Sequence, residues 1–323
     1  MGVRTQTLGL FKAVHQDARH WQILALSGLF CLSLTTSDFG ARPSALLAAI
    51  IGAMSAQAAG TVWVNARKER RRARSGSYWR GSSLEAGFVG WFAGFQWKSA
   101  LITSLSLSIL LRANSLWFWL AAGFIAISAK FLIRYRGKHL FNPACIGIVT
   151  VSLLAGSAAW VSPGQWGQTP FFAAFAIGFA ALVLSSAKRL DIALGFLIGF
   201  AAMLFGRALY LGDPMAIPIH QMQSGALLVF AFFMITDPRS TPDSRLARLI
   251  FAFAVAALAA WMSWEFHIRG AMLYALAGLA LLSPVLDRVL PARRFEWTSK
   301  KEKPDELETS RGGVRPRPHI VRA

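Results

Sequence analysis

The sequence predicts an all-α membrane protein with ten transmembrane helices. Two features of the composition indicate this class: 55% of the 323 residues are hydrophobic and only 15% are charged. The mean hydropathy of +0.46 is too high for an ordinary soluble domain. The third indication is the distribution of lysine and arginine, which alternates between rich and poor connections along the chain. One membrane domain therefore accounts for most of the sequence.

Ten apolar stretches come close to the ~17–25 residues that a transmembrane helix requires. They define a polar N-terminal segment at 1–19, a membrane domain at 20–290 and a polar, basic tail at 291–323. The tail contains few bulky apolar residues, so we expect it to be disordered and cytoplasmic. The polar start lacks a small-residue cleavage site, which favours a retained first span over a signal peptide. The predicted spans are 20–36, 43–65, 97–111, 115–133, 143–161, 170–187, 190–206, 223–236, 246–264 and 268–286.

Basic residues orient these spans. With the spans placed as above, 28 of the 34 lysines and arginines lie in connections on one side of the membrane and four lie on the other. Cationic segments resist translocation, so the basic side is expected to be cytoplasmic. The sequence therefore predicts a multi-pass protein of the bacterial inner membrane with both termini in the cytoplasm.

The most basic stretch is RKERRRAR at 67–74, which we interpret as a loop that binds anionic lipid at the cytoplasmic surface. Nucleic-acid binding is disfavoured because neither interleaved aromatic residues nor a recognition fold accompanies the charges.

The residues that carry chemistry in soluble enzymes are sparse. Cys31 and Cys145 lie in separate apolar segments, and the six histidines are scattered, so no disulfide framework or metal site is predicted. No nucleotide-binding, metalloprotease or hydrolase signature occurs, and no catalytic residue is predicted.

Two segments five spans apart resemble each other. KSALITSLSLS (Lys98–Ser108) and QSGALLVFAFF (Gln223–Phe233) share a short pattern of small and apolar residues. Two halves of five spans each would enter the membrane from opposite faces, and this inverted arrangement places binding sites near the midplane. Since only a few residues match, chance similarity of apolar helices is the alternative.

The first predicted helix break is at Asn142 and Pro143. Proline suits the first turn of a helix, and asparagine directly before it can accept a hydrogen bond from a free main-chain amide. Such a start inside the protein would create a polar site. The alternative is an ordinary helix start at the cytoplasmic interface.

The second predicted break follows span 223–236, at Thr236, Asp237 and Pro238. A carboxylate at a membrane edge must be solvated, paired or hydrogen-bonded, and Arg239 is the expected partner. A capped turn at the lipid interface is the alternative. At the other end of this span, Ser224 and Gly225 permit close approach by a flat ligand or a neighbouring helix.

Three motifs together resemble one family. WKSALITS (Trp97–Ser104), GKHLFNPACIG (Gly137–Gly147) and the long segment from His220 to Phe251 are similar to the RnfD/NqrB family. Its members are the D-type membrane subunits of Rnf electron-transport complexes and the B-type subunits of the sodium-translocating NADH:quinone reductase. The resemblance runs from about 97 to 290. It implies ten spans in two inverted five-helix repeats, a urea-transporter-like fold.

The resemblance also implies a flavin. Family members carry FMN on a threonine in an outer loop, but here that loop is only Ser162–Pro170 and lacks the flanking motif around Thr169. The chain therefore resembles a divergent branch, and a noncovalent FMN or riboflavin is expected in place of covalent FMN at Thr169. Seven expected cofactor-binding residues match the family's motifs, namely Asn142, Pro143, Ser224, Gly225, Ala226, Thr236 and Asp237. Thr169 is the eighth candidate, as the less favoured covalent site.

The expected function follows from this resemblance. The protein would be a membrane subunit that holds a flavin and relays electrons with other membrane and redox subunits of a complex, as part of a redox-driven translocase. The alternative is a channel or transporter for a small neutral solute with the same fold, because charged residues are scarce within the spans. A third possibility is a scaffold within a larger membrane complex.

Overall fold

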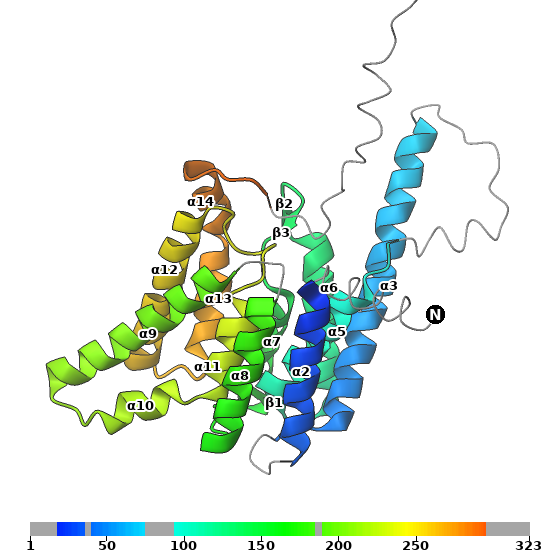
Figure 1. Cartoon of the computed structure of the whole chain (residues 1–323). Coiled ribbons are helices and arrows are strands. Elements are labelled where there is room, and N and C mark those ends of the chain that lie inside the picture. The colour runs from blue at the N-terminus through cyan, green and yellow to red at the C-terminus, as the bar shows by residue number, and fades with distance from the viewer. Residues whose placement is uncertain (1–17, 36–39, 75–93, 185–188, 295–323) are drawn as a thin grey trace, which may run out of the picture.

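The computed structural model describes residues 18–35, 40–74, 94–184 and 189–294. This part of the chain is mostly helical, as the sequence predicts, but it also contains two short two-stranded antiparallel sheets. The all-α prediction is therefore corrected in this detail. The sheets lie at opposite ends of the helical bundle (Figure 1), where they replace irregular connections between helices.

Ten apolar segments, each helical in the described residues, coincide with the predicted spans. Those of the first half are α2 (Ala18–Thr35), α3 (Pro43–Arg74), α5 (Trp97–Leu110), α6 (Leu116–Leu132) and α7 (Pro143–Ala155). Those of the second half are α8 (Gln168–Leu184), α9 (Leu190–Leu211), α11 (Gly225–Val229) continued by the π-helix η3 (Phe230–Met234), α12 (Arg245–Glu265) and α13 (Ala271–Ala280). Shorter elements are η2 (Gly156–Ala158), α10 (Ala216–Met222) and α14 (Ser283–Val289).

Not all of these helices are long enough to cross a bilayer by themselves. Within the described residues, three helices, α3, α9 and α12, have sufficient length and hydropathy. The number rises to five if the bent pairs of α10 with α11–η3 and of α13 with α14 each form one span. The helices α5, α6, α7 and α8 are apolar but shorter. The protein is thus a multi-pass membrane protein, and ten spans remain a prediction.

Two predicted boundaries differ from the structure. The basic stretch 67–74, expected as a loop, continues α3 to Arg74, because arginine, lysine, glutamate and alanine are all strong helix formers. The predicted span 143–161 is helical only to Ala155. Gly156, with φ of 55°, ends the helix, and the chain continues through η2 into strand β4 (Ala159–Val161). The predicted segment 1–19 lies outside the described residues except for its last two, and the tail is described only to 294.

The helices of the two halves pack in matching pairs. α3 lies along α6 as α9 lies along α12, and α6 contacts α7 as α12 contacts α13. Across the halves, α2 packs on α8 and α7 packs on α13. The α3–α6 pair is especially close, because a Cβ on Gly52 would lie 2.0 Å from the main-chain oxygen of Leu120. Small residues allow such close packing of membrane helices.

The sheets fix the connections at the two ends. Strand β1 (Leu111–Ala113) pairs with β4 at one end, and β2 (Arg134–Tyr135) pairs with β3 (Lys138–His139) at the other. The β2–β3 turn has positive φ at Arg136 (47°) and Gly137 (82°). Positive φ at both central residues is what a type I′ turn requires, and this type is common in two-residue hairpins. This hairpin carries His139 to the beginning of α7.

Candidate functional site

A polar cavity lies between the two halves, at the end of the bundle that carries the β2–β3 hairpin. We call it the central cavity; its volume is about 70 Å³. Its walls come from α2, α5, α6, the hairpin, the start of α7 and the segment after η3. Polar side chains that line the cavity include Ser99, Thr103, Lys130, His139, Asn142 and Asp237.

Asn142 connects the two broken helix ends. Its side-chain oxygen accepts a hydrogen bond from the main-chain N–H of Cys145 (3.0 Å) and so caps α7, with Pro143 in the first turn as predicted. Its side-chain nitrogen donates to the main-chain oxygen of Met234, 3.2 Å away, at the end of η3. Helix ends leave carbonyl oxygens without partners in the helix, and Asn142 satisfies one of them.

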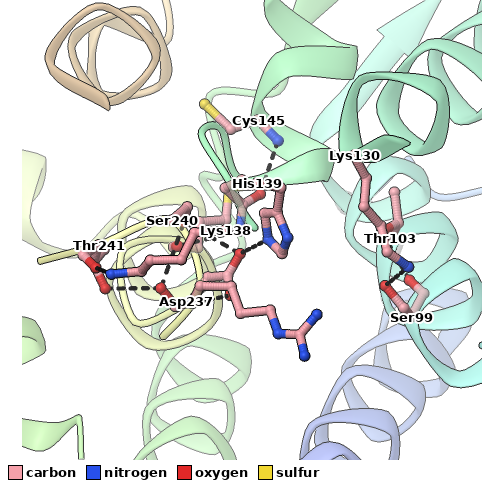
Figure 2. Close-up of polar contacts among 12 residues, drawn as sticks. Ser99, Thr103, Lys130, Lys138, His139, Cys145, Asp237, Ser240 and Thr241 are labelled. Carbon is pink, nitrogen blue, oxygen red and sulfur yellow. Dashed lines mark hydrogen bonds and ion pairs between the residues drawn. The ribbon is translucent and has the colours of Figure 1, made fainter. Parts of the chain in front are cut away.

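Asp237 lies in a dense set of hydrogen bonds. One carboxylate oxygen accepts from His139 Nε2 (3.0 Å) and from the hydroxyl of Ser240 (3.2 Å), as Figure 2 shows. The other accepts from the main-chain N–H of Arg239 (3.1 Å). Arg239, the predicted partner of Asp237, therefore contacts it through a main-chain hydrogen bond. The ion-pair partner of Asp237 is His139.

The pKa of Asp237 reflects two opposing effects. Burial alone would raise it, because it disfavours the charged carboxylate. The positive charge of His139 and its hydrogen bond, together with those from Arg239 and Ser240, lower the pKa of Asp237 below its ordinary value. Asp237 is therefore an ionised carboxylate that the protein itself stabilises.

His139 was not singled out by the sequence. It is buried, and within the described residues its Nδ1 atom has no hydrogen-bond partner, whereas Nε2 contacts Asp237. The one signal in the sequence is its place in GKHLFNPACIG, three residues before the predicted cap Asn142. His139 lines the cavity, is held there by a carboxylate, and keeps Nδ1 as a buried atom without a partner among the described residues.

Lys130 is the second residue that the sequence did not single out. Its side chain is buried, with 4% of the residue exposed, and its amine donates to Gln57 Oε1 (3.1 Å) and to the hydroxyl of Ser99 (3.2 Å; Figure 2). A lone lysine near the end of an apolar span was the available signal, because ionisable groups in membrane helices usually serve a function.

The predicted residues Ser224, Gly225 and Ala226 do not line the central cavity. Ser224 caps α11 and donates to the main-chain oxygen of Pro163 (2.9 Å), and the N–H of Gly225 donates to Gly164 (2.7 Å). A Cβ on Gly225 would lie 2.0 Å from the ring of Trp166. The small residues at this end of α11 therefore allow close approach of the loop at 162–167.

The two predicted threonines also lie outside the cavity. Thr236 is buried, and its hydroxyl donates to the main-chain oxygen of Phe232 (2.7 Å). Thr169, predicted in the outer loop, is exposed in the first turn of α8. Of the eight predicted cofactor-binding residues, the structure therefore brings Asn142, Pro143 and Asp237 together at one cavity.

A second pocket, of about 270 Å³, adjoins the central cavity and shares His139 and Arg239 with it. One wall is an ion-pair cluster in which Lys138 lies 2.9 Å from both Asp243 and Asp287 and donates to the main-chain oxygen of Thr241 (3.1 Å; Figure 2). These bonds fix the β2–β3 hairpin against the segment after η3 and against α14.

Comparison with known proteins identifies similar sequences. Residues 151–296 match the family model described as the NQR2, RnfD, RnfE family. Over this range the chain is similar to that family. The match includes η3 and Asp237, and it begins after Asn142 and His139, so these two residues lie outside the matched range. The resemblance that the sequence motifs indicate is confirmed.

Curated relatives carry one name, which describes the D-type subunit of an ion-translocating oxidoreductase complex. The protein of Alcanivorax borkumensis is 26% identical over 261 residues, covering 61% of this chain and 75% of the relative. That of Pseudomonas paraeruginosa is 26% identical over 262 residues, covering 61% and 74%. That of Escherichia coli O81 is 35% identical over 108 residues, covering 33% of this chain and 26% of the relative. The similarity to these proteins is therefore low in identity and covers part of this chain.

Proposed function

We propose that this protein is the D-type membrane subunit of an ion-translocating oxidoreductase complex and that it holds a flavin, FMN or riboflavin, noncovalently at the central cavity. The observation that carries the proposal is the Asn142–Met234 hydrogen bond, which joins a helix start and a helix end from different halves of the chain beside a polar cavity. The family match and the names of the relatives support the assignment to such a complex.

The groups at the cavity suit a flavin. The edge of its ring system carries hydrogen-bond donors and acceptors, and the cavity is lined by hydroxyl groups, the Lys130 side chain and the imidazole of His139. Ligand pockets usually measure roughly 300–1,000 Å³, so 70 Å³ admits part of such a ligand. The adjoining pocket of 270 Å³ extends the available space.

The chain's own contribution is geometry and electrostatics. A bound flavin would supply one- and two-electron transfer. Asn142 keeps the two helix ends together, and Asp237 holds the ring of His139 in one orientation with Nδ1 unpaired. Phe233, a buried residue of η3, forms an apolar part of the cavity wall.

The wider architecture is also part of the proposal. We propose that the two halves are inverted five-helix repeats, because α3–α6 and α6–α7 contacts recur as α9–α12 and α12–α13 contacts. The basic end, which carries the hairpin and the 67–74 extension of α3, would face the cytoplasm and anionic lipid of the bacterial inner membrane. Other membrane and redox subunits would complete the complex.

The test is purification of the full chain from bacterial membranes together with its neighbouring subunits, followed by absorption spectroscopy and mass spectrometry. The expected result is a flavin that is retained in detergent and released intact on denaturation. Absence of flavin, combined with uptake of a neutral solute into liposomes without a redox partner, would contradict the proposal and favour the transporter alternative.

A further inference from the structure

The ionisable residues that line the central cavity are predominantly cationic. They are Arg19, Lys130, His139, Asp237 and Arg239. Asp237 is the one carboxylate among the described residues of this lining, and His139, Ser240 and the main chain of Arg239 already occupy its oxygen atoms. The lining therefore carries more positive than negative charge.

The Lys130 amine donates its hydrogen bonds to neutral partners, an amide oxygen and a hydroxyl. The charged groups that act on it are Arg239, Arg134 and Arg19, which repel it, and Asp237, which attracts it. Burying an ammonium without a paired anion is unfavourable, so a bound negative charge would stabilise this position.

The guanidinium of Arg239 is attracted by the carboxylate of Asp237 and repelled by Arg134, Arg19 and Arg294. Within the described residues it makes no hydrogen bond or ion pair, since the contact of Arg239 with Asp237 uses the main-chain N–H. The side chain is half-buried and borders both the central cavity and the adjoining pocket. The guanidinium of an arginine in such a position provides several N–H donors for an anionic oxygen or nitrogen atom of a ligand.

We propose that the central cavity is built for an anionic ligand and that Lys130 and Arg239 hold its negative charge. This inference rests on the proposed flavin site and specifies it further. A flavin gains negative charge on reduction when it takes up fewer protons than electrons, whereas its oxidised ring is neutral. The cavity therefore binds the reduced flavin more tightly than the oxidised flavin, and Lys130 and Arg239 raise the reduction potential of the bound ring.

A purely structural role for Lys130 would give a different result. Its hydrogen bonds tie α6 to α3 through Gln57 and to α5 through Ser99. If this were its whole contribution, loss of the amine would lower stability and weaken binding of both flavin states equally. The ratio of the two affinities therefore separates charge recognition from helix packing.

The experiment measures dissociation constants of oxidised and dithionite-reduced riboflavin for the full-length protein in detergent without oxygen. In Lys130→Gln we expect the preference for reduced riboflavin to fall roughly tenfold or more. For a two-electron couple, each tenfold change corresponds to about 30 mV in midpoint potential. Lys130→Arg should keep the preference. Lys98→Gln is the matched control, because Lys98 lies in the first turn of α5 but does not line the cavity.

Arg239→Gln provides an independent variant should Lys130→Gln fail to fold, with the exposed Arg245→Gln as its control. An unchanged affinity ratio in Lys130→Gln or Arg239→Gln would overturn the inference while leaving the flavin site intact. Failure of the wild-type protein to bind either flavin state would overturn the proposed function itself, and the inference with it.

Discussion

Asn142 and Met234 lie 92 positions apart in the chain, and a single side-chain hydrogen bond of 3.2 Å joins them. Through this bond the start of α7 in the first half is attached to the end of η3 in the second half. The same asparagine caps α7 through Cys145. The start of α7 and the end of η3 both border the central cavity. The Asn142 side chain therefore helps to set the distance between these two parts of the cavity wall.

Replacing Asn142 should separate its two roles. Asn142→Ala removes the cap and the bond to Met234 and should lower the free energy of unfolding by about 1–3 kcal/mol. Asn142→Asp keeps an acceptor for Cys145 but loses the donor to Met234, so it should retain the cap and still loosen flavin binding. Thermal unfolding in detergent and flavin titration measure the two effects. Asn114→Ala, at the exposed end of β1, is the control; an equal effect there would contradict the account.

Gly225 should not tolerate a side chain. A Cβ at this position would lie 2.0 Å from the Trp166 ring, so Gly225→Ala should destabilise the protein by about 1–3 kcal/mol through overpacking. Gly206→Ala is the matched control, since a Cβ on Gly206 meets no atom within 4 Å and alanine favours a helix. Thermal unfolding of both variants tests the prediction. Equal stability of the two would show that α11 and the 162–167 loop are not packed as described.

Asp237 should make stability depend on acidic pH. Because its pKa is lower in the folded protein than its ordinary value, its contribution is fully present above that ordinary value and is lost as the pH falls through the folded pKa. Unfolding measured from about pH 3 to 7 should show this loss in the wild type. Asp237→Asn should be less stable at neutral pH and show a flatter profile below it. Asp213→Asn, which alters a partly exposed acid near Arg207, is the control and should keep the wild-type profile.

Thr169 should not carry the flavin. It is exposed in the first turn of α8 and does not line the central cavity, and its surroundings lack the sequence motif of covalent FMN attachment. Thr169→Ala should therefore retain as much flavin as the wild type. Fluorescence of the denatured protein on a gel is the measurement. A fluorescent wild-type band that disappears in Thr169→Ala would establish covalent attachment.

The sequence predicted the local features of the candidate site. Proline after asparagine identified the start of α7 and its cap, and the Thr-Asp-Pro segment identified the end of the helix that contains η3. Both are properties of neighbouring residues, so a single sequence contains them. Ser224 was likewise recognised at the start of α11, although its partner, the loop at 162–167, was not.

Features that depend on distant residues could not be predicted. The pairing of Asp237 with His139 joins positions 98 apart, and no local pattern specifies it. The bonds of Lys130 to Gln57 and Ser99 have the same character. The π-helical turn at η3 also depends on its surroundings, because the apolar run from Phe230 to Met234 suits an α-helix equally well. Hydropathy located the apolar segments but not where Gly156 would end α7.

The most direct test of the central claim is the flavin content of the purified wild-type protein compared with that of Asn142→Ala. The account predicts a noncovalent flavin in the wild type, close to one per chain, and a clear loss in the variant while the protein remains folded. A folded wild-type protein that contains no flavin when purified with its partner subunits, or an Asn142→Ala variant that retains it fully, would contradict the claim that the cavity between the two helix ends is the cofactor site.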